Sequence, residues 1–201
     1  YRYVVWSVWH NGLGVGWIPM ARQGTAIPKC SVGYFVNGRT NELLFCNMTE
    51  EVKKSYFTTG QMRNALIQIE DQMVHSAWMP SIILGINRGG CIPGVYLSHR
   101  LRVPHEALDI RLRDHQAKPN LATLEKAFAF QKKILIIDDI NDSGATFKYI
   151  EDNFGRNEDR VRFAALVNNK PSAVKLNYHG YEINKEEAPA WIVFPWEEWD
   201  K

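Results

Sequence analysis

Three aspartates and a run of small residues stand close together in ILIIDDINDSGAT, residues 134–146. Asp138 and Asp139 directly follow four apolar residues, and Asp142 comes three positions after Asp139. Carboxylates at the end of an apolar strand are suited to binding sugar hydroxyls and a hard cation such as Mg²⁺. We therefore interpret this stretch as a candidate site for a polar ligand.

The four residues after the last aspartate are typical of an anion site. Ser143, Gly144, Ala145 and Thr146 open a predicted helix over residues 145–154. Backbone N–H groups at a helix start, with the helix dipole and two hydroxyls, bind phosphate well. An aspartate here can also be a simple helix cap. The aspartates are suited to the sugar diol, and residues 143–146 are suited to a phosphate. Together they match the two ends of a ribose 5-phosphate, and this combination favours a binding site.

A second candidate anion loop lies earlier in the chain, in ILGINRGG. Arg88, Gly89 and Gly90 connect a predicted strand to a predicted helix. Glycine lets backbone amides approach an anion closely, and the arginine guanidinium offers a fixed fork for phosphate oxygens. The alternative is a surface turn with a solvated arginine.

These residues need elements that bring them together. Apolar spacing predicts helices over residues 61–78, 91–101 and 145–154. Apolar or alternating runs predict strands over residues 81–86, 105–112, 134–137, 161–167 and 191–194. This alternation indicates an α/β domain with a mainly parallel, twisted sheet flanked by helices. Ligands bind beyond the carboxyl ends of the strands in such sheets, where the aspartates and Arg88 are expected.

Residues 1–47 differ in composition and pattern from the rest of the chain. They hold three of the seven Trp and six of the fourteen Gly, without a sustained helical period. The spacing of GLGVG does not match a dinucleotide-binding loop. We expect either a short β-rich appendage or a stretch ahead of a natural start at Met48, with one main domain over residues 48–201.

Composition excludes several classes of function. The formal net charge is +2 and no basic run occurs, which argues against nucleic acid as a partner. No apolar run approaches about 18 residues, so we expect no membrane span. The three cysteines, Cys30, Cys46 and Cys91, are widely spaced, which favours a reducing cytoplasm over a disulfide framework.

The stretch ILIIDDINDSGAT resembles the phosphoribosyl-diphosphate (PRPP) signature of type I phosphoribosyltransferases, with Ser143 where threonine is commoner. The resemblance implies that Asp138 and Asp139 bind the ribose 2′- and 3′-hydroxyls. It also implies that Asp139 helps to hold Mg²⁺, with Asp138 as a second candidate ligand. Residues 143–146 would bind the 5-phosphate.

Two further stretches resemble the xanthine-guanine members of that family. Residues 88–90 resemble the pyrophosphate loop, in which a cis non-proline peptide bond often precedes the basic residue. Lys170 and the sequence WIVFPWE resemble the base-binding hood, expected near residues 170–201. By this resemblance Lys170 donates to the purine 6-oxo group, Trp191 stacks on the base, and Ile192 offers backbone groups. The polar residues 113–120 resemble the family's mobile flap.

The resemblance implies a Mg²⁺-dependent transferase of purine salvage. It would move the 5-phosphoribosyl group from PRPP to guanine, xanthine or hypoxanthine, releasing pyrophosphate and a nucleoside 5′-monophosphate. Asp142 would accept the proton of purine N7, and the protein would be a dimer or tetramer. Two alternatives stay open: a PRPP-binding regulator without catalysis, or a transferase for another base. Lys170 favours a 6-oxo acceptor over adenine, which carries a donor at that position.

Overall fold

The computed structural model describes residues 34–36, 43–45, 53–110, 119–155 and 157–200. The chain forms two compact units, Tyr1–Glu51 and Val52–Lys201. Within the first unit, β1 (Tyr34–Val36) and β2 (Leu43–Phe45) form an antiparallel pair. Met48, the predicted natural start, and residues 111–118, which hold most of the predicted flap, lie outside the described residues.

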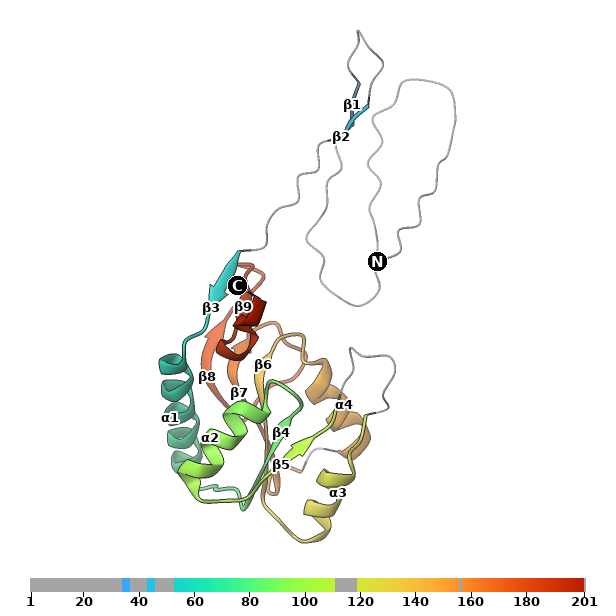
Figure 1. The fold of residues 1–201 in the computed structure, drawn as a ribbon. Coiled ribbons are helices and arrows are strands. Elements are labelled where there is room, and N and C mark those ends of the chain that lie inside the picture. Colours follow the sequence, from blue (N-terminus) through green and yellow to red (C-terminus); the bar gives the residue numbers. More distant parts are fainter. Residues whose placement is uncertain (1–33, 37–42, 46–52, 111–118, 156, 201) are drawn as a thin grey trace. The chain divides into compact units, whose positions relative to one another are not determined.

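A five-stranded sheet forms the centre of the second unit, with strand order β5-β4-β6-β7-β8 (Figure 1). All four pairings are parallel. The strands are β4 (Ile82–Ile86), β5 (His105–Leu108), β6 (Ile134–Asn141), β7 (Val161–Asn169) and β8 (Tyr178–Ile183). The predicted parallel α/β architecture is therefore confirmed.

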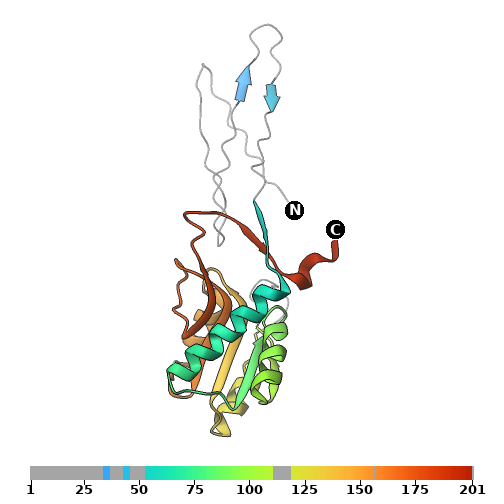
Figure 2. The ribbon, with the colours of Figure 1, turned by 90° about the vertical axis from the view of Figure 1, so that its left-hand side faces the viewer.

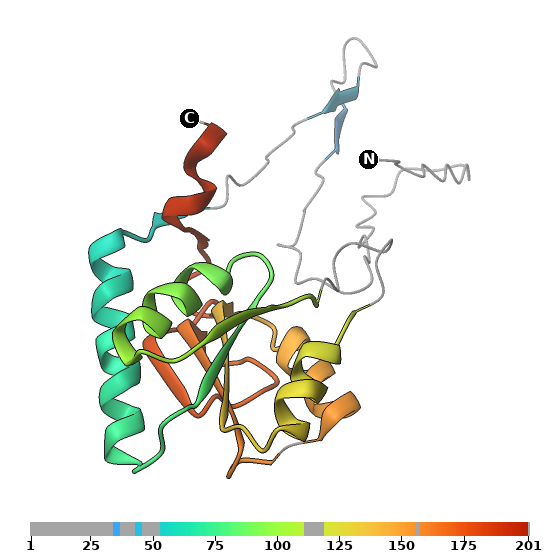
Figure 3. The same cartoon turned by 60° about the horizontal axis from the view of Figure 1, so that its bottom comes forward.

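Helices cover both faces of this sheet (Figure 3). They are α1 (Thr59–His75), α2 (Cys91–Leu101), α3 (Ala122–Ala129) and α4 (Ala145–Phe154). Leu135 and Ile137 of β6 pack in the cluster that α1 and α2 join. Ile134 and Ile136 pack in the opposite cluster, with α3 and α4. A strand covered on both faces is apolar throughout, which explains why β6 begins with four consecutive buried residues.

The predicted helix over residues 61–78 differs at both ends from α1. Thr58 and Gln61 form a capping box, so the helix begins at Thr59. It ends at His75, and the left-handed Ala77 (φ 51°) turns the chain so that Trp78 enters the core. Helices α2 and α4 have the predicted bounds. None of the helices among the described residues is long and apolar enough to cross a membrane.

A two-stranded parallel sheet lies apart from the main sheet (Figure 2). It pairs β3 (Lys54–Tyr56) with β9 (Trp191–Val193), so that Lys54 lies opposite Trp191. The 3-10 turn Pro195–Asp200 follows β9. We call β3, β9 and this turn the hood. The hood therefore includes β3, from the beginning of the second unit, whereas the sequence patterns placed the hood only at the C-terminal end.

Candidate active site

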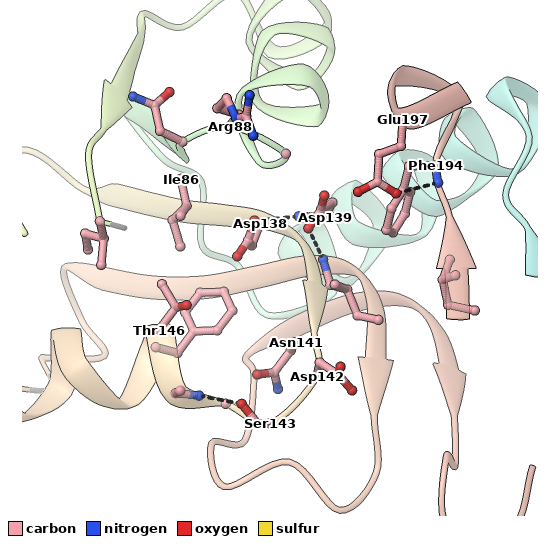
Figure 4. A pocket seen from close by; sticks show the side chains of 18 of the residues that line it. Ile86, Arg88, Asp138, Asp139, Asn141, Asp142, Ser143, Thr146, Phe194 and Glu197 are labelled. Atoms are coloured by element: carbon pink, nitrogen blue, oxygen red, sulfur yellow. Dashed lines mark hydrogen bonds between the residues drawn. The ribbon is translucent and has the colours of Figure 1, made fainter. Parts of the chain in front are cut away.

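A cavity of about 770 Å³ opens at the carboxyl ends of β4 and β6. It brings together most of the predicted site residues: Arg88, Gly89, Asp138, Asp139, Asp142, Ser143, Gly144, Ala145, Thr146, Trp191 and Ile192. In Figure 4, Arg88 lies on one side of the cavity, Ser143 and Thr146 lie on the other, and Asp138 and Asp139 lie between them. Two predicted site residues, Gly90 and Lys170, are not in this lining.

Strand β6 continues four residues beyond the predicted end at Ile137. Pairing with β7 extends as far as Asn141, which lies opposite Asn168. Asp138 and Asp139 therefore belong to the strand itself. The backbone N–H of Asp139 donates to Asp138 Oδ1 at 2.9 Å, and that of Ile140 donates to Asp139 Oδ1 at 2.7 Å. These bonds orient both carboxylates, which line the cavity.

Asp139 has the most unusual surroundings of the three aspartates. Burial raises the pKa of this carboxyl group, and the nearby Glu197 carboxylate raises it further, against the lowering effect of bonds to the Ile140 N–H and the Asp138 side chain. A Cβ atom added to Gly89 would lie 1.8 Å from Asp139 Oδ2. Only glycine therefore lets the loop after β4 approach this carboxylate so closely. Burial and Glu197 both disfavour the charged form of this partly buried carboxyl group, and a cation beside it would stabilise that form.

The loop after β4 is fixed by its own hydrogen bonds. The Asn87–Arg88 peptide bond is cis, as the resemblance implied. Cys91 Sγ donates to Asn87 Oδ1 at 3.0 Å and to the Gly85 carbonyl at 3.3 Å. Gly90 is the N-cap residue of α2. The loop thus presents Arg88 to the cavity from a defined backbone.

The candidate phosphate loop depends on Gly144. This residue is left-handed (φ 83°), and an added Cβ would lie 2.6 Å from Ser172 Oγ. Helix α4 begins at Ala145, whose N–H donates to Ser143 Oγ at 3.4 Å. The N-terminal end of the helix, where the dipole favours an anion, is therefore part of the cavity lining.

Asn141 supports the candidate phosphate loop through side-chain hydrogen bonds. It was not predicted as a functional residue. Its side chain is buried, and its Nδ2 donates to Asn168 Oδ1 at 2.8 Å and to the Val174 carbonyl at 2.9 Å. Ser172 Oγ donates to Asn141 Oδ1 at 2.9 Å. The only sequence signal was an asparagine between two acids, which also fits an exposed turn.

Asp142 contacts two residues that the sequence did not single out. Lys185 Nζ lies 2.9 Å from Asp142 Oδ2, and Asn169 Nδ2 donates to Asp142 Oδ1 at 3.3 Å. Lys185 also lines the cavity. Lys170, the predicted purine contact, pairs instead with Glu182 at 3.3 Å. No motif marked Lys185, because it stands in the polar stretch after β8.

The hood supplies the aromatic side of the cavity. Trp191 lines the cavity with half of its side chain exposed, and Ile192 is partly buried beside it. Phe194 stacks on Trp196, with ring centroids 5.0 Å apart and an interplanar angle of 7°. An exposed indole face is suited to stacking on a planar base.

The match to known proteins agrees with this geometry. Residues 54–200 match the family model described as phosphoribosyl transferase domain. The chain therefore belongs to the phosphoribosyltransferase family, a class of glycosyltransferases whose substrates are PRPP and a base. The predicted family and fold are both confirmed.

Solved structures give the same fold. The chain is similar to purine phosphoribosyltransferase from Pyrococcus horikoshii, at 28% identity over 74% of this chain and 97% of that one, with a TM-score of 0.56. The xanthine-guanine-hypoxanthine phosphoribosyltransferase from Helicobacter pylori is 18% identical over 72% of this chain and 94% of that one, with a TM-score of 0.53. The second likeness shows the fold alone.

Proposed function

We propose that this protein transfers the 5-phosphoribosyl group from PRPP to a 6-oxopurine, producing a nucleoside 5′-monophosphate and pyrophosphate. The observation that carries this proposal is the single cavity that joins Arg88, the Asp138–Asp139 pair, the loop 143–146 and Trp191. Across the cavity, Arg88 would correspond to the pyrophosphate, the two aspartates to the ribose, and the loop 143–146 to the 5-phosphate. The base would lie beside the hood. The likeness to a purine enzyme from Pyrococcus horikoshii supports a purine acceptor.

The sugar phosphate would be bound from both ends. Arg88 and the backbone of Gly89 would contact the pyrophosphate, and Asp138 and Asp139 would accept hydrogen bonds from the ribose hydroxyls. The amides and hydroxyls of residues 143–146 would hold the 5-phosphate. Binding at both ends would place the anomeric carbon near Asp142 and the hood, and such positioning lowers the entropic part of the barrier.

A Mg²⁺ ion fits the acidic side of this cavity. The described residues contain no cluster of three or more His, Cys, Asp and Glu side chains with metal-ligand geometry. Mg²⁺ is commonly held by one or two carboxylates together with substrate oxygens, and the partly buried Asp139 would be its main protein ligand, with Asp138 as the second. When bound, the ion would neutralise charge on the leaving pyrophosphate.

Asp142 would act on the base. Its carboxylate would accept the N7 proton of the purine, so that N9 attacks the anomeric carbon as the bond to pyrophosphate breaks. Trp191 would stack on the ring, and the Ile192 backbone would contact the 2-position. Arg88 would stabilise the negative charge that builds on the departing pyrophosphate.

Pyrophosphate release tests the proposal. The protein is mixed with Mg²⁺ and PRPP, and then separately with guanine, hypoxanthine, xanthine, adenine and orotate. We expect release with at least one of the three 6-oxopurines and much less with adenine or orotate. Release with none of these bases would favour a PRPP-binding protein without catalysis. Release with orotate or adenine alone would show that the protein is specific for a base other than a 6-oxopurine.

A further inference from the structure

Ser172, in the loop after β7, lies directly against the candidate phosphate loop. A Cβ atom added to Gly144 would lie 2.6 Å from Ser172 Oγ, 2.9 Å from the Val174 backbone nitrogen and 3.0 Å from the Ala173 backbone nitrogen. The two loops are therefore packed without room for a side chain between them. Ser172 is partly buried and is not among the residues that line the cavity. Any effect that it has on a ligand would pass through the loop that it supports.

The Ser172 hydroxyl makes two hydrogen bonds that fix its position. It donates to Asn141 Oδ1 at 2.9 Å and accepts from the Val174 N–H at 3.4 Å. Asn141 is only 1% exposed, and its Nδ2 donates to the Val174 carbonyl at 2.9 Å. This hydroxyl therefore joins the buried end of β6 to the loop after β7.

The backbone of the loop after β7 is also bonded to the phosphate loop. The Ala173 N–H donates to the Ser143 carbonyl at 3.1 Å. The Gly144 carbonyl in turn accepts from the Lys148 N–H at 2.8 Å, in the first turn of α4. The positions of Ser143 and Gly144, and with them the start of α4, therefore depend on residues 172–174.

The backbone groups that would bind a 5-phosphate belong to this supported segment, because residues 143–146 line the cavity. Donors at a helix start bind an anion more tightly when they are already oriented, since the ligand then does not have to order them. Loss of the support should therefore weaken a ligand that carries a 5-phosphate. A ligand held only by Arg88, on the other side of the cavity (Figure 4), should be unaffected.

We propose that Ser172 is a positioning residue for PRPP, which holds residues 143–146, through Gly144 and Asn141, in the geometry that binds the 5-phosphate. This assignment rests on the proposed function, in which that loop is the 5-phosphate site. It adds to it a residue that contacts no substrate and that changes the affinity for one end of PRPP only.

The test compares Ser172→Ala with Ser98→Ala, each of which removes one serine hydroxyl. Ser98 lies on α2, donates to the Val95 carbonyl at 2.9 Å and does not line the cavity. Titration calorimetry with Mg²⁺ measures the binding of ribose 5-phosphate, pyrophosphate and PRPP to the wild type and to both variants. Ser172→Ala should weaken ribose 5-phosphate and PRPP by about 3- to 10-fold, the effect of losing one neutral hydrogen bond. Its affinity for pyrophosphate should be unchanged, and Ser98→Ala should bind all three ligands as the wild type does.

Two outcomes would overturn the assignment alone. One is a wild type that binds all three ligands and a Ser172→Ala variant that binds ribose 5-phosphate equally tightly. The other is an equal loss for ribose 5-phosphate and pyrophosphate in Ser172→Ala, which would show that the hydroxyl only stabilises the fold. A wild type that binds neither ribose 5-phosphate nor PRPP would overturn the proposed function as well.

Discussion

At the scale of single residues, the three aspartates after the apolar half of β6 have different surroundings and therefore different expected roles. Asp139 is partly buried and lies against Gly89, whereas Asp142, which also lines the cavity, is paired with Lys185. Asp138 lies between Arg88 and Thr146 in the cavity (Figure 4). Substituting the aspartates one at a time should separate binding of the sugar phosphate from proton transfer.

Asp142→Asn should lower kcat by about 100-fold or more, because an amide cannot accept the purine proton. The KM for PRPP should change little, since this side chain is expected to contact the base. Steady-state kinetics with hypoxanthine measure both quantities. Unchanged turnover in this variant would remove Asp142 from the chemical step.

Asp139→Asn should instead weaken binding of PRPP and of Mg²⁺ together, because it removes a partly buried carboxylate that a cation would neutralise. Titration calorimetry with PRPP in the presence and absence of Mg²⁺ gives the two affinities. Asp152→Asn is the matched control, because Asp152 lies on α4 in an exposed pair with Lys148. Equal affinities in the wild type and the Asp139 variant would show that the ligand does not use this carboxylate.

At the scale of elements, the sequence predicted α2 and α4 fully because each has apolar spacing and lies next to glycine. It did not predict α3 or β8. Helix α3 has eight residues, a short span for periodicity to show, and Leu124 and Ala127 are its only buried residues. The polar end of β6 was also missed, since strand pairing with β7 rather than hydrophobicity extends it to Asn141.

Asn141 joins the end of β6 to the loop after β7. Asn141→Ala should lower the free energy of unfolding by about 1–3 kcal/mol, because it leaves buried polar partners unsatisfied. Urea unfolding measures this loss. The control is Asn153→Ala, which removes a hydrogen bond from an exposed asparagine of α4. Similar losses in the two variants would contradict a special role for the buried amide.

At the scale of the whole molecule, the cavity depends on segments that are distant in the sequence. Patterns near the strand ends identified Arg88, the aspartates and residues 143–146, because these motifs are local. Lys185 was missed because its partner, Asp142, is 43 positions away. Strand β3 was missed because three exposed residues form it only by pairing with β9. Long-range contacts of this kind leave no local pattern.

His105 couples the stability of the second unit to pH. Its Nε2 atom is buried with no hydrogen-bond partner among the residues that the structure describes. Burial lowers the pKa of His105, and Glu106 offsets this only in part. The unfolded chain therefore takes up the proton more readily, so stability present above about pH 6.5 is lost as the pH falls below it.

The wild type should have a lower midpoint temperature of thermal unfolding at pH 5 than at pH 7. This difference should be smaller in His105→Gln, which has no titrating group at that position. His75→Gln changes an exposed histidine at the end of α1 and should keep the wild-type dependence. A pH dependence in His105→Gln equal to that of the wild type would show that other groups cause it.

The most direct test of the site is a crystal structure of the protein with PRPP and Mg²⁺. We predict that the ribose hydroxyls contact Asp138 and Asp139, the 5-phosphate lies at residues 143–146, and the pyrophosphate contacts Arg88. A sugar phosphate bound in the reverse direction, or outside this cavity, would contradict the proposed mode of binding.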